Sequence, residues 1–201
     1  MAASLTSTDL TLDNTSGASI PGTPAAGQTV LYPKDDKLLY YKNDAGQELP
    51  PGKVVQVVNF QTGAVATGTT VMPGDDTIPQ ITEGDQYMSQ TFTPTNANNI
   101  LLIDVVMIAS INADVLMGIA LFRDAVADAL ASAMFYPRDI NSLIDAVCFR
   151  HKMAAGGTSE ITFRIRSGGS GASTVTFNGR AGARVYGGAL ASSITITELT
   201  P

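Results

Sequence analysis

The side chains of this sequence that could do chemistry are few and widely spaced. His151 is the only histidine and Cys148 the only cysteine, and both lie in the apolar segment Val147-Cys-Phe-Arg-His151. A nucleophile must lie within hydrogen-bond reach of its base, but residues three apart on a strand point to opposite faces. We therefore interpret Cys148 as an inert, buried thiol and His151 as a structural or surface side chain.

The carboxylate pairs are predicted to serve turns rather than catalysis. Asp35-Asp36 and Asp75-Asp76 are flanked by Pro, Gly or Lys, which is typical of solvated turns. An alternative for Asp75, Asp76 and Glu83 is a structural calcium site, because oxygen-rich loops suit that ion. The glycine-rich run 168–171 lacks the Lys-Ser/Thr of a phosphate loop. We expect no catalytic site, no cofactor and no required metal, so the protein is predicted not to be an enzyme.

Composition favours a protein that packs against copies of itself or within a larger assembly. Only 15% of the 201 residues are charged, 6% are aromatic, and there is no Trp. The net charge of −6 and the scattered Lys and Arg residues argue against nucleic acid or an anionic membrane as partner. The apolar stretch 100–122 is long enough to span a bilayer, but Asp104 and Asp114 interrupt it, so no membrane insertion is expected.

Short alternating strands separated by glycine are the clearest pattern in the chain. In Ile161–Arg166 the apolar residues fall on one face and Thr and Arg on the other, as a half-buried strand requires. Similar segments recur about every ten residues from residue 53 onwards. The fold class that this predicts is all-β, an antiparallel jelly-roll sandwich. The predicted strands are Val54–Asn59, Ala64–Val71, Ser89–Thr93, Ile100–Ala109, Val115–Phe122, Val147–Met153, Ile161–Arg166, Ser173–Phe177, Ala183–Tyr186 and Ser193–Leu199.

One window has the composition of a helix. Residues 124–134 are rich in Ala, and Asp124 could act as its N-cap. We interpret this window as part of a long connection, 123–143, with at most a helical turn or two.

Three regions are predicted along the chain. Residues 1–26 have the composition of an extended attachment arm. Residues 27–52 read as a small β-hairpin region followed by the linker Pro50-Pro51-Gly52. Residues 53–201 form the jelly-roll head. Because a lone hairpin is marginal in water, the hairpin is expected to pack on the head or on other subunits.

Oligomer formation is predicted from two strands that are apolar on both faces. One face of an antiparallel sandwich sheet is usually solvated, yet Ile100–Ala109 and Val115–Phe122 are nearly continuously apolar. We therefore predict a homotrimer in which part of one of these strands faces neighbouring subunits.

Several short motifs resemble those of tailed-phage fibre proteins. Pro24–Tyr32 and Lys37–Gly46 resemble a segment that precedes the distal domain of such fibres. Further motifs resemble landmarks of a trimeric head domain in the same kind of protein: Asp76–Gly84, Phe92–Thr95, Ala120–Asp124 and Thr195–Glu198. The resemblance covers about residues 24–200.

What the resemblance implies is a bacteriophage virion protein with a jelly-roll head like that of the tumour necrosis factor family. No long shaft precedes the head, which favours a short trimeric fibre or knob on the tail, collar or capsid. The arm would bind other virion proteins and the head would take part in host attachment. The alternative is a decoration or adaptor protein of the virion without receptor binding.

The position of a receptor-contact loop follows from counting strands. If Val54–Asn59 and Ile194–Leu199 are the first and last strands, both chain ends lie at one pole. Counting back from the C-terminus places the connections 94–99, 123–143, 167–172 and 187–193 at the other pole. The longest of these carries Phe135, Tyr136, Arg138 and Asp139, which we predict to contact a host cell-surface receptor. The alternative is that Phe135 and Tyr136 only anchor the loop to the core.

Overall fold

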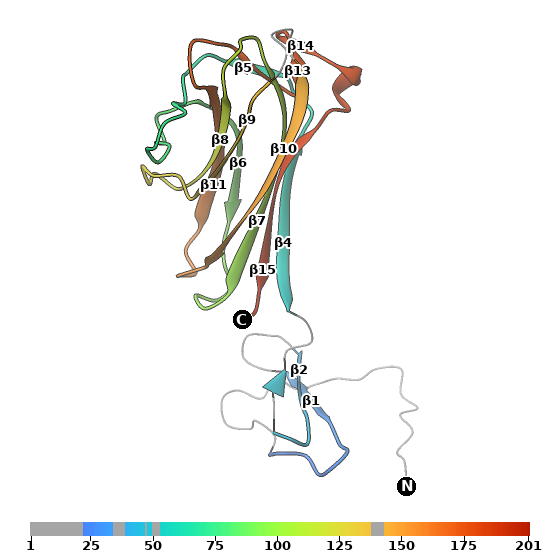
Figure 1. Ribbon diagram of the computed structural model, residues 1–201. Coiled ribbons are helices and arrows are strands. Elements are labelled where there is room, and N and C mark those ends of the chain that lie inside the picture. Colours follow the sequence, from blue (N-terminus) through green and yellow to red (C-terminus); the bar gives the residue numbers. More distant parts are fainter. Residues whose placement is uncertain (1–21, 34–38, 47, 50–52, 138–142) are drawn as a thin grey trace. The chain divides into compact units, whose positions relative to one another are not determined.

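A computed structural model describes residues 22–33, 39–46, 48–49, 53–137 and 143–201. The described residues form antiparallel strands, and their only helical element is a 3-10 turn at Tyr186–Gly188 (Figure 1). The all-β prediction is therefore confirmed. The chain divides into two compact units, Met1–Lys53 and Val54–Pro201.

The N-terminal unit contains the expected hairpin. Strand β1 (Val30–Pro33) pairs with β2 (Leu39–Lys42), and the short β3 (Glu48–Leu49), which the sequence did not indicate, pairs with β2. The Tyr32 and Tyr40 rings lie 6.4 Å apart across the hairpin. The Asp35-Asp36 pair that was expected to lie in a turn, residues 1–21 of the predicted arm and the predicted linker Pro50-Pro51-Gly52 lie outside the described residues.

The second unit, the head, is a sandwich of two antiparallel sheets. In the first sheet the strand order is β4-β15-β7-β12-β5, and β10 pairs with the other side of β7; the second sheet has the order β6-β11-β8-β9. The first sheet comprises β4 (Val54–Thr62), β5 (Ala66–Gly68), β7 (Ile100–Ile111), β10 (Ile144–Ala154), β12 (Val175–Phe177) and β15 (Ser192–Leu199). The second comprises β6 (Asp85–Phe92), β8 (Met117–Arg123), β9 (Ala131–Phe135) and β11 (Ile161–Gly169).

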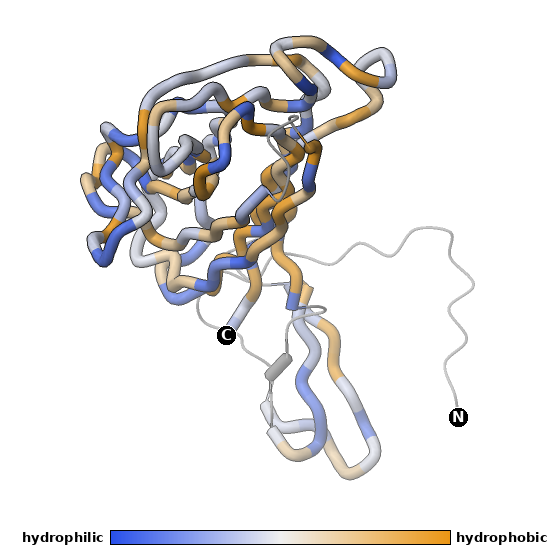
Figure 2. Tube along the Cα trace, turned by 45° about the horizontal axis from the view of Figure 1, so that its top comes forward, coloured by the Kyte–Doolittle hydropathy of each residue, from blue (hydrophilic) through white to orange (hydrophobic). Residues whose placement is uncertain are grey.

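The core lies between the two sheets because alternate residues of each strand point inward. On β7, Leu101, Ile103 and Met107 are fully buried, and they belong to the same apolar cluster as Phe163 and Leu121 of the second sheet. Figure 2 shows long hydrophobic stretches along the strands of the head, while hydrophilic segments lie mainly in its loops.

Part of the outer face of the second sheet, over β8 and β11, is covered by the chain itself. Met72, in the loop between β5 and β6, is 2% exposed and packs on Ala120 and Phe122, which point outward from β8. A Cβ atom at Gly168 of β11 would lie 2.3 Å from the Thr70 carbonyl oxygen, so only glycine lets this loop approach so closely. Arg166 fastens the end of the loop by donating to the Glu83 and Gly84 carbonyls at 2.9 and 2.6 Å.

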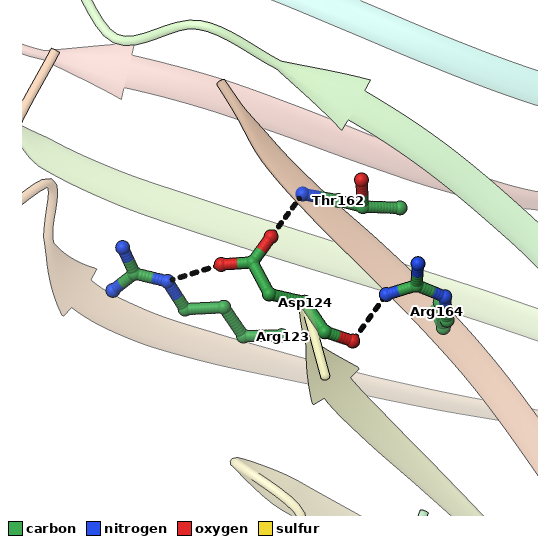
Figure 3. Close-up of polar contacts among 4 residues, drawn as sticks. All are labelled: Arg123, Asp124, Thr162 and Arg164. Carbon is green, nitrogen blue, oxygen red and sulfur yellow. Dashed lines mark hydrogen bonds and ion pairs between the residues drawn. The ribbon is translucent and has the colours of Figure 1, made fainter. Parts of the chain in front are cut away.

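The window 124–134 contains no helix. It forms a turn followed by β9, which pairs with β8 from Met117↔Phe135 to Leu121↔Ala131. Asp124 starts the turn with a positive φ of 52°. Figure 3 shows its polar contacts. Its carboxylate accepts from the Thr162 N–H at 2.8 Å and from Arg123 Nε at 3.3 Å, and its carbonyl accepts from Arg164. Asp124 therefore closes a strand end rather than capping a helix.

The missed strand changes which loops share a pole. β4 and β15 pair from Ser192↔Thr62 to Leu199↔Val54, so both ends of the head lie at one pole, here called the base pole, as predicted. Because β9 adds one reversal, 94–99 and the turn 124–130 also lie at the base pole, which corrects the predicted placement. The opposite, distal pole holds the loops 112–116, 170–174 and 178–191 and the described residues 136–137 after β9. The loop 69–84 starts at the distal pole and reaches the turn 124–130, where the Ile81 N–H donates to the Ala127 carbonyl at 2.8 Å.

Two further predicted strands are shorter than expected. The predicted strand Ala64–Val71 is reduced to the three residues of β5. Ala183–Tyr186 is not a sandwich strand; β14 (Ala183–Arg184) forms only a two-residue ribbon with β13 (Gly179–Arg180). The other strand predictions overlap strands of the structure.

Candidate interaction surfaces

The outward surface of the first sheet presents a grid of side chains from four strands. Register places them in three rows that run from β4 through β15 and β7 to β10. We call these twelve residues the open face: Val57, Thr197, Leu102 and Lys152; Asn59, Thr195, Asp104 and Arg150; Gln61, Ser193, Val106 and Cys148.

The open face differs from the covered part of the second sheet in the exposure of its apolar residues. Val57 is 55% exposed, and Leu102 and Val106 are partly exposed. The strands in substantial contact with β7 are its sheet neighbours β10, β15 and β12, together with β13 (Gly179–Arg180), which follows β12 along the chain. The loop that carries Met72 therefore buries Ala120 and Phe122 of β8, whereas Leu102 and Val106 of β7 remain partly exposed.

The middle row of the open face is polar from edge to edge. Arg150 Nε donates to Asp104 Oδ1 at 2.6 Å, and this hydrogen bond and the Asp104 charge raise the pKa of the Arg150 guanidinium. At the other end, Asn59 Nδ2 donates to Thr195 Oγ1 at 2.7 Å.

Cys148 lies on this face and is exposed, which corrects the prediction of a buried thiol. β10 is an edge strand whose even-numbered residues in this region point outward and whose odd-numbered residues, including His151, point toward the core. Burial lowers the pKa of His151. Cys148 and His151 therefore lie on opposite faces, as the spacing predicted, and cannot act as a nucleophile–base pair.

The acidic residues considered for calcium are engaged locally. Asp75 Oδ1 accepts from both the N–H and the hydroxyl of Thr77, which lowers the pKa of Asp75. Glu83 Oε2 accepts from the Gln80 N–H at 2.9 Å. No group of three or more potential metal ligands occurs among the described residues. Asp35 and Asp36 lie outside the described part of the chain.

The predicted receptor loop begins at the distal pole. Phe135 is partly buried and packs against the core, as the anchoring alternative supposed. Tyr136 is 52% exposed, and its hydroxyl donates to Asp114 of the β7–β8 loop. This hydrogen bond raises the pKa of Tyr136. Arg138 and Asp139 lie outside the described residues.

The base pole contains a buried carboxylate that sequence reasoning did not single out. Glu198 of β15 is fully buried. Its Oε1 accepts from the Thr95 N–H and the Asn99 amide at 2.8 Å each, and its Oε2 accepts from the Gln56 amide at 2.6 Å. Burial alone would raise the pKa of Glu198, but these hydrogen bonds outweigh it and lower the pKa. The sequence did contain a signal for this site, because Glu198 is the only charged residue in the strand β15.

No helix among the described residues is long and apolar enough to cross a membrane.

Fold and topology define the head as an antiparallel jelly-roll sandwich. The family described as "Pgp3 C-terminal domain" matches residues 68–201, which are 134 of the 201 residues. The chain therefore belongs to this family. A search of curated proteins gives no match.

Solved structures show only distant likeness. The Eiger TNF from S. frugiperda is 10% identical over 72% of this chain and 93% of that chain, with a TM-score of 0.39. The infectious bursal disease virus Gt strain structure is 11% identical over 81% of this chain and 44% of that chain, with a TM-score of 0.35. The chain thus corresponds to less than half of that viral chain.

Proposed function

We propose that this protein is a structural virion protein whose head assembles into a homotrimer through the open face. The observation that carries the proposal is the contrast between the two sheets. Outward apolar residues of β8 are buried under the loop that carries Met72, whereas Val57, Leu102 and Val106 of the first sheet are exposed or partly exposed. A partly apolar sheet face with few charges is the kind of surface that a second copy covers.

The attachment end in this proposal is the base pole. Val54 starts β4 there, so the chain enters the head at that pole. The N-terminal region, including the predicted arm, would bind other virion proteins on the tail, collar or capsid of a bacteriophage. The distal pole would then point outward, where Tyr136 is exposed beside Asp114. A host cell-surface receptor is the proposed partner of that pole.

A decoration or adaptor protein without receptor binding is the second candidate. The observation that favours it is the anchoring of Phe135 in the core, which leaves fewer free aromatic groups on the predicted loop. Replacing Tyr136 by Ala distinguishes the two candidates. Reduced adsorption of particles to cells supports the receptor role, and unchanged adsorption supports decoration.

Neither candidate includes catalysis, a cofactor or a metal. Supporting this, His151 and Cys148 are separated by the sheet, and Asp75 and Glu83 are used in turns.

The assembly surface is tested by placing a charge on it. Val106→Glu puts a carboxylate on the open face, at β7 between Ser193 and Cys148, and is expected to yield a folded monomer. Met134→Glu is the matched control, because Met134 is 61% exposed on β9 of the second sheet. Sedimentation equilibrium should give a trimer for the control. If Val106→Glu remains a trimer, the open face is not the interface.

A further inference from the structure

The middle row of the open face has chemically different ends. Arg150 lies at the β10 edge, and its side chain is 63% exposed although Nε is bonded to Asp104. Guanidinium carries five N–H donors and no acceptor, so donors remain available there. Asn59 lies exposed at the β4 edge and uses its amide nitrogen on Thr195, which leaves its amide oxygen as an acceptor.

Within one copy these two ends cannot meet. Arg150 and Asn59 are separated by β7 and β15, which is three strand spacings or roughly 14 Å. Arg150 is also held toward Asp104 by the 2.6 Å bond. A donor at one edge and an acceptor at the other therefore complement each other only between copies.

We propose that the polar row sets the register of the assembly, with Arg150 of one copy donating to the Asn59 amide oxygen of the next. The inference rests on the proposed self-association through the open face. A contact that joins two different edges is head-to-tail, and a rotation that closes such contacts makes a ring.

The two rows beside the polar row do not favour one alignment of neighbouring copies over another, so the polar row would determine that alignment. The row of Leu102 and the row of Val106 offer apolar side chains, which attract one another in many alignments. A guanidinium buried at the interface without an acceptor would lose hydrogen bonds that it makes in water. Alignments that bury the Arg150 donors not used by Asp104 without an acceptor are therefore disfavoured.

A double-mutant cycle on the full chain tests the contact. Arg150→Met keeps an apolar stem without donors, and Asn59→Leu removes the acceptor at similar size. Each change is expected to lower the association constant by about ten-fold or more per interface, as loss of a hydrogen bond to a charged group does. Effects on Asp104 or Thr195 within one copy occur in both the single and the double variant, so they cancel.

The expected result is coupling: the double variant assembles about as well as the weaker single variant. Lys152→Met is the matched control, because Lys152 is on the same strand and face but one row away, and it should not couple to Asn59→Leu. Independent effects of Arg150→Met and Asn59→Leu that simply multiply would overturn the inference.

A second variant keeps the test informative if Arg150→Met does not fold. Asn59→Asp places a carboxylate where Arg150 of the next copy is expected, so assembly should tighten at low salt and the gain should shrink as salt rises. Unchanged or weaker assembly would also overturn the contact. A trimer with no coupling refutes only the register inference, whereas an unaltered chain that is monomeric at micromolar concentration refutes the proposed self-association as well.

Discussion

Glu198 joins three segments at the base pole through its hydrogen bonds. Gln56 belongs to β4, Thr95 and Asn99 belong to the β6–β7 connection, and all three donate to its carboxylate. Both carboxylate oxygens of Glu198 accept hydrogen bonds. A glutamine in its place would have an NH2 group at one of these two positions, where it would face another N–H donor. The residue is therefore a structural clamp where the chain enters and leaves the head.

Glu198→Gln should lower the free energy of unfolding at pH 7 by about 1.5–3 kcal/mol, the range for hydrogen bonds to a charged group. The pKa of Glu198 is lowered in the folded state from its ordinary value of 4.5. Its contribution is therefore fully present above pH 4.5 and is lost as pH falls through the folded pKa. Urea unfolding at a series of pH values should show a smaller acid-induced loss in the variant.

The control for this effect is Glu160→Gln, because Glu160 is exposed. It should change neither the stability at pH 7 nor the acid-induced loss appreciably. Equal behaviour of the two variants would contradict the role assigned to Glu198.

Asp124 combines an uncommon backbone conformation with a capping carboxylate. A positive φ is unfavourable for most residues but less so for Asp and Asn. Asp124→Ala should therefore lower the free energy of unfolding by about 1–2 kcal/mol through strain and the lost bond to the Thr162 N–H. Asp124→Asn keeps an oxygen acceptor and should cost less. Thermal unfolding checks the order, and an Asn variant as unstable as the Ala variant would argue against it.

At the scale of elements, the sequence correctly predicted the long strands that bury one face in the core. β7, β11 and β15 alternate over most of their length, because one face meets the core. β9 was missed because Ala-Ser-Ala-Met-Phe has no such pattern, and its strand conformation depends on pairing with β8. Because β9 was missed, connections that precede it in the chain, such as 94–99, were assigned to the wrong pole of the head.

The covered face of β8 shows a limit of sequence reasoning about oligomers. Outward apolar residues are expected both where another subunit packs and where a distant loop folds back. The loop residue Met72 lies far from β8 in sequence, and only its packing on Ala120 and Phe122 distinguishes the two cases. The burial of Cys148 could not be predicted from its apolar neighbours for the same reason. Its exposure depends on the position of β10 at the edge of the sheet, with Cys148 on the outward side.

Met72→Ala tests the assignment of this cover. The loss of a buried side chain should lower the free energy of unfolding by about 2–3 kcal/mol, in the lower part of the range for such changes because the cluster is small. The assembled mass should not change, because this face is not the interface. Val71→Ala is the control, since its neighbour Val71 is 38% exposed. Dissociation caused by Met72→Ala would mean that the second sheet takes part in assembly.

At the scale of the whole molecule, the lone thiol reports on assembly. Cys148 is exposed in one copy and lies on the open face. If that face is covered by another copy, a maleimide should label Cys148 more slowly in the unaltered protein than in the Val106→Glu monomer. Equal labelling rates would place Cys148 outside the interface.

The central claim is that the open face of the head assembles three copies of the chain. Sedimentation equilibrium of the full chain between about 1 and 50 µM tests it most directly, a range suited to affinities of micromolar or better. The expected mass is three times the chain mass of 20.9 kDa. A single species of 20.9 kDa throughout that range would contradict it.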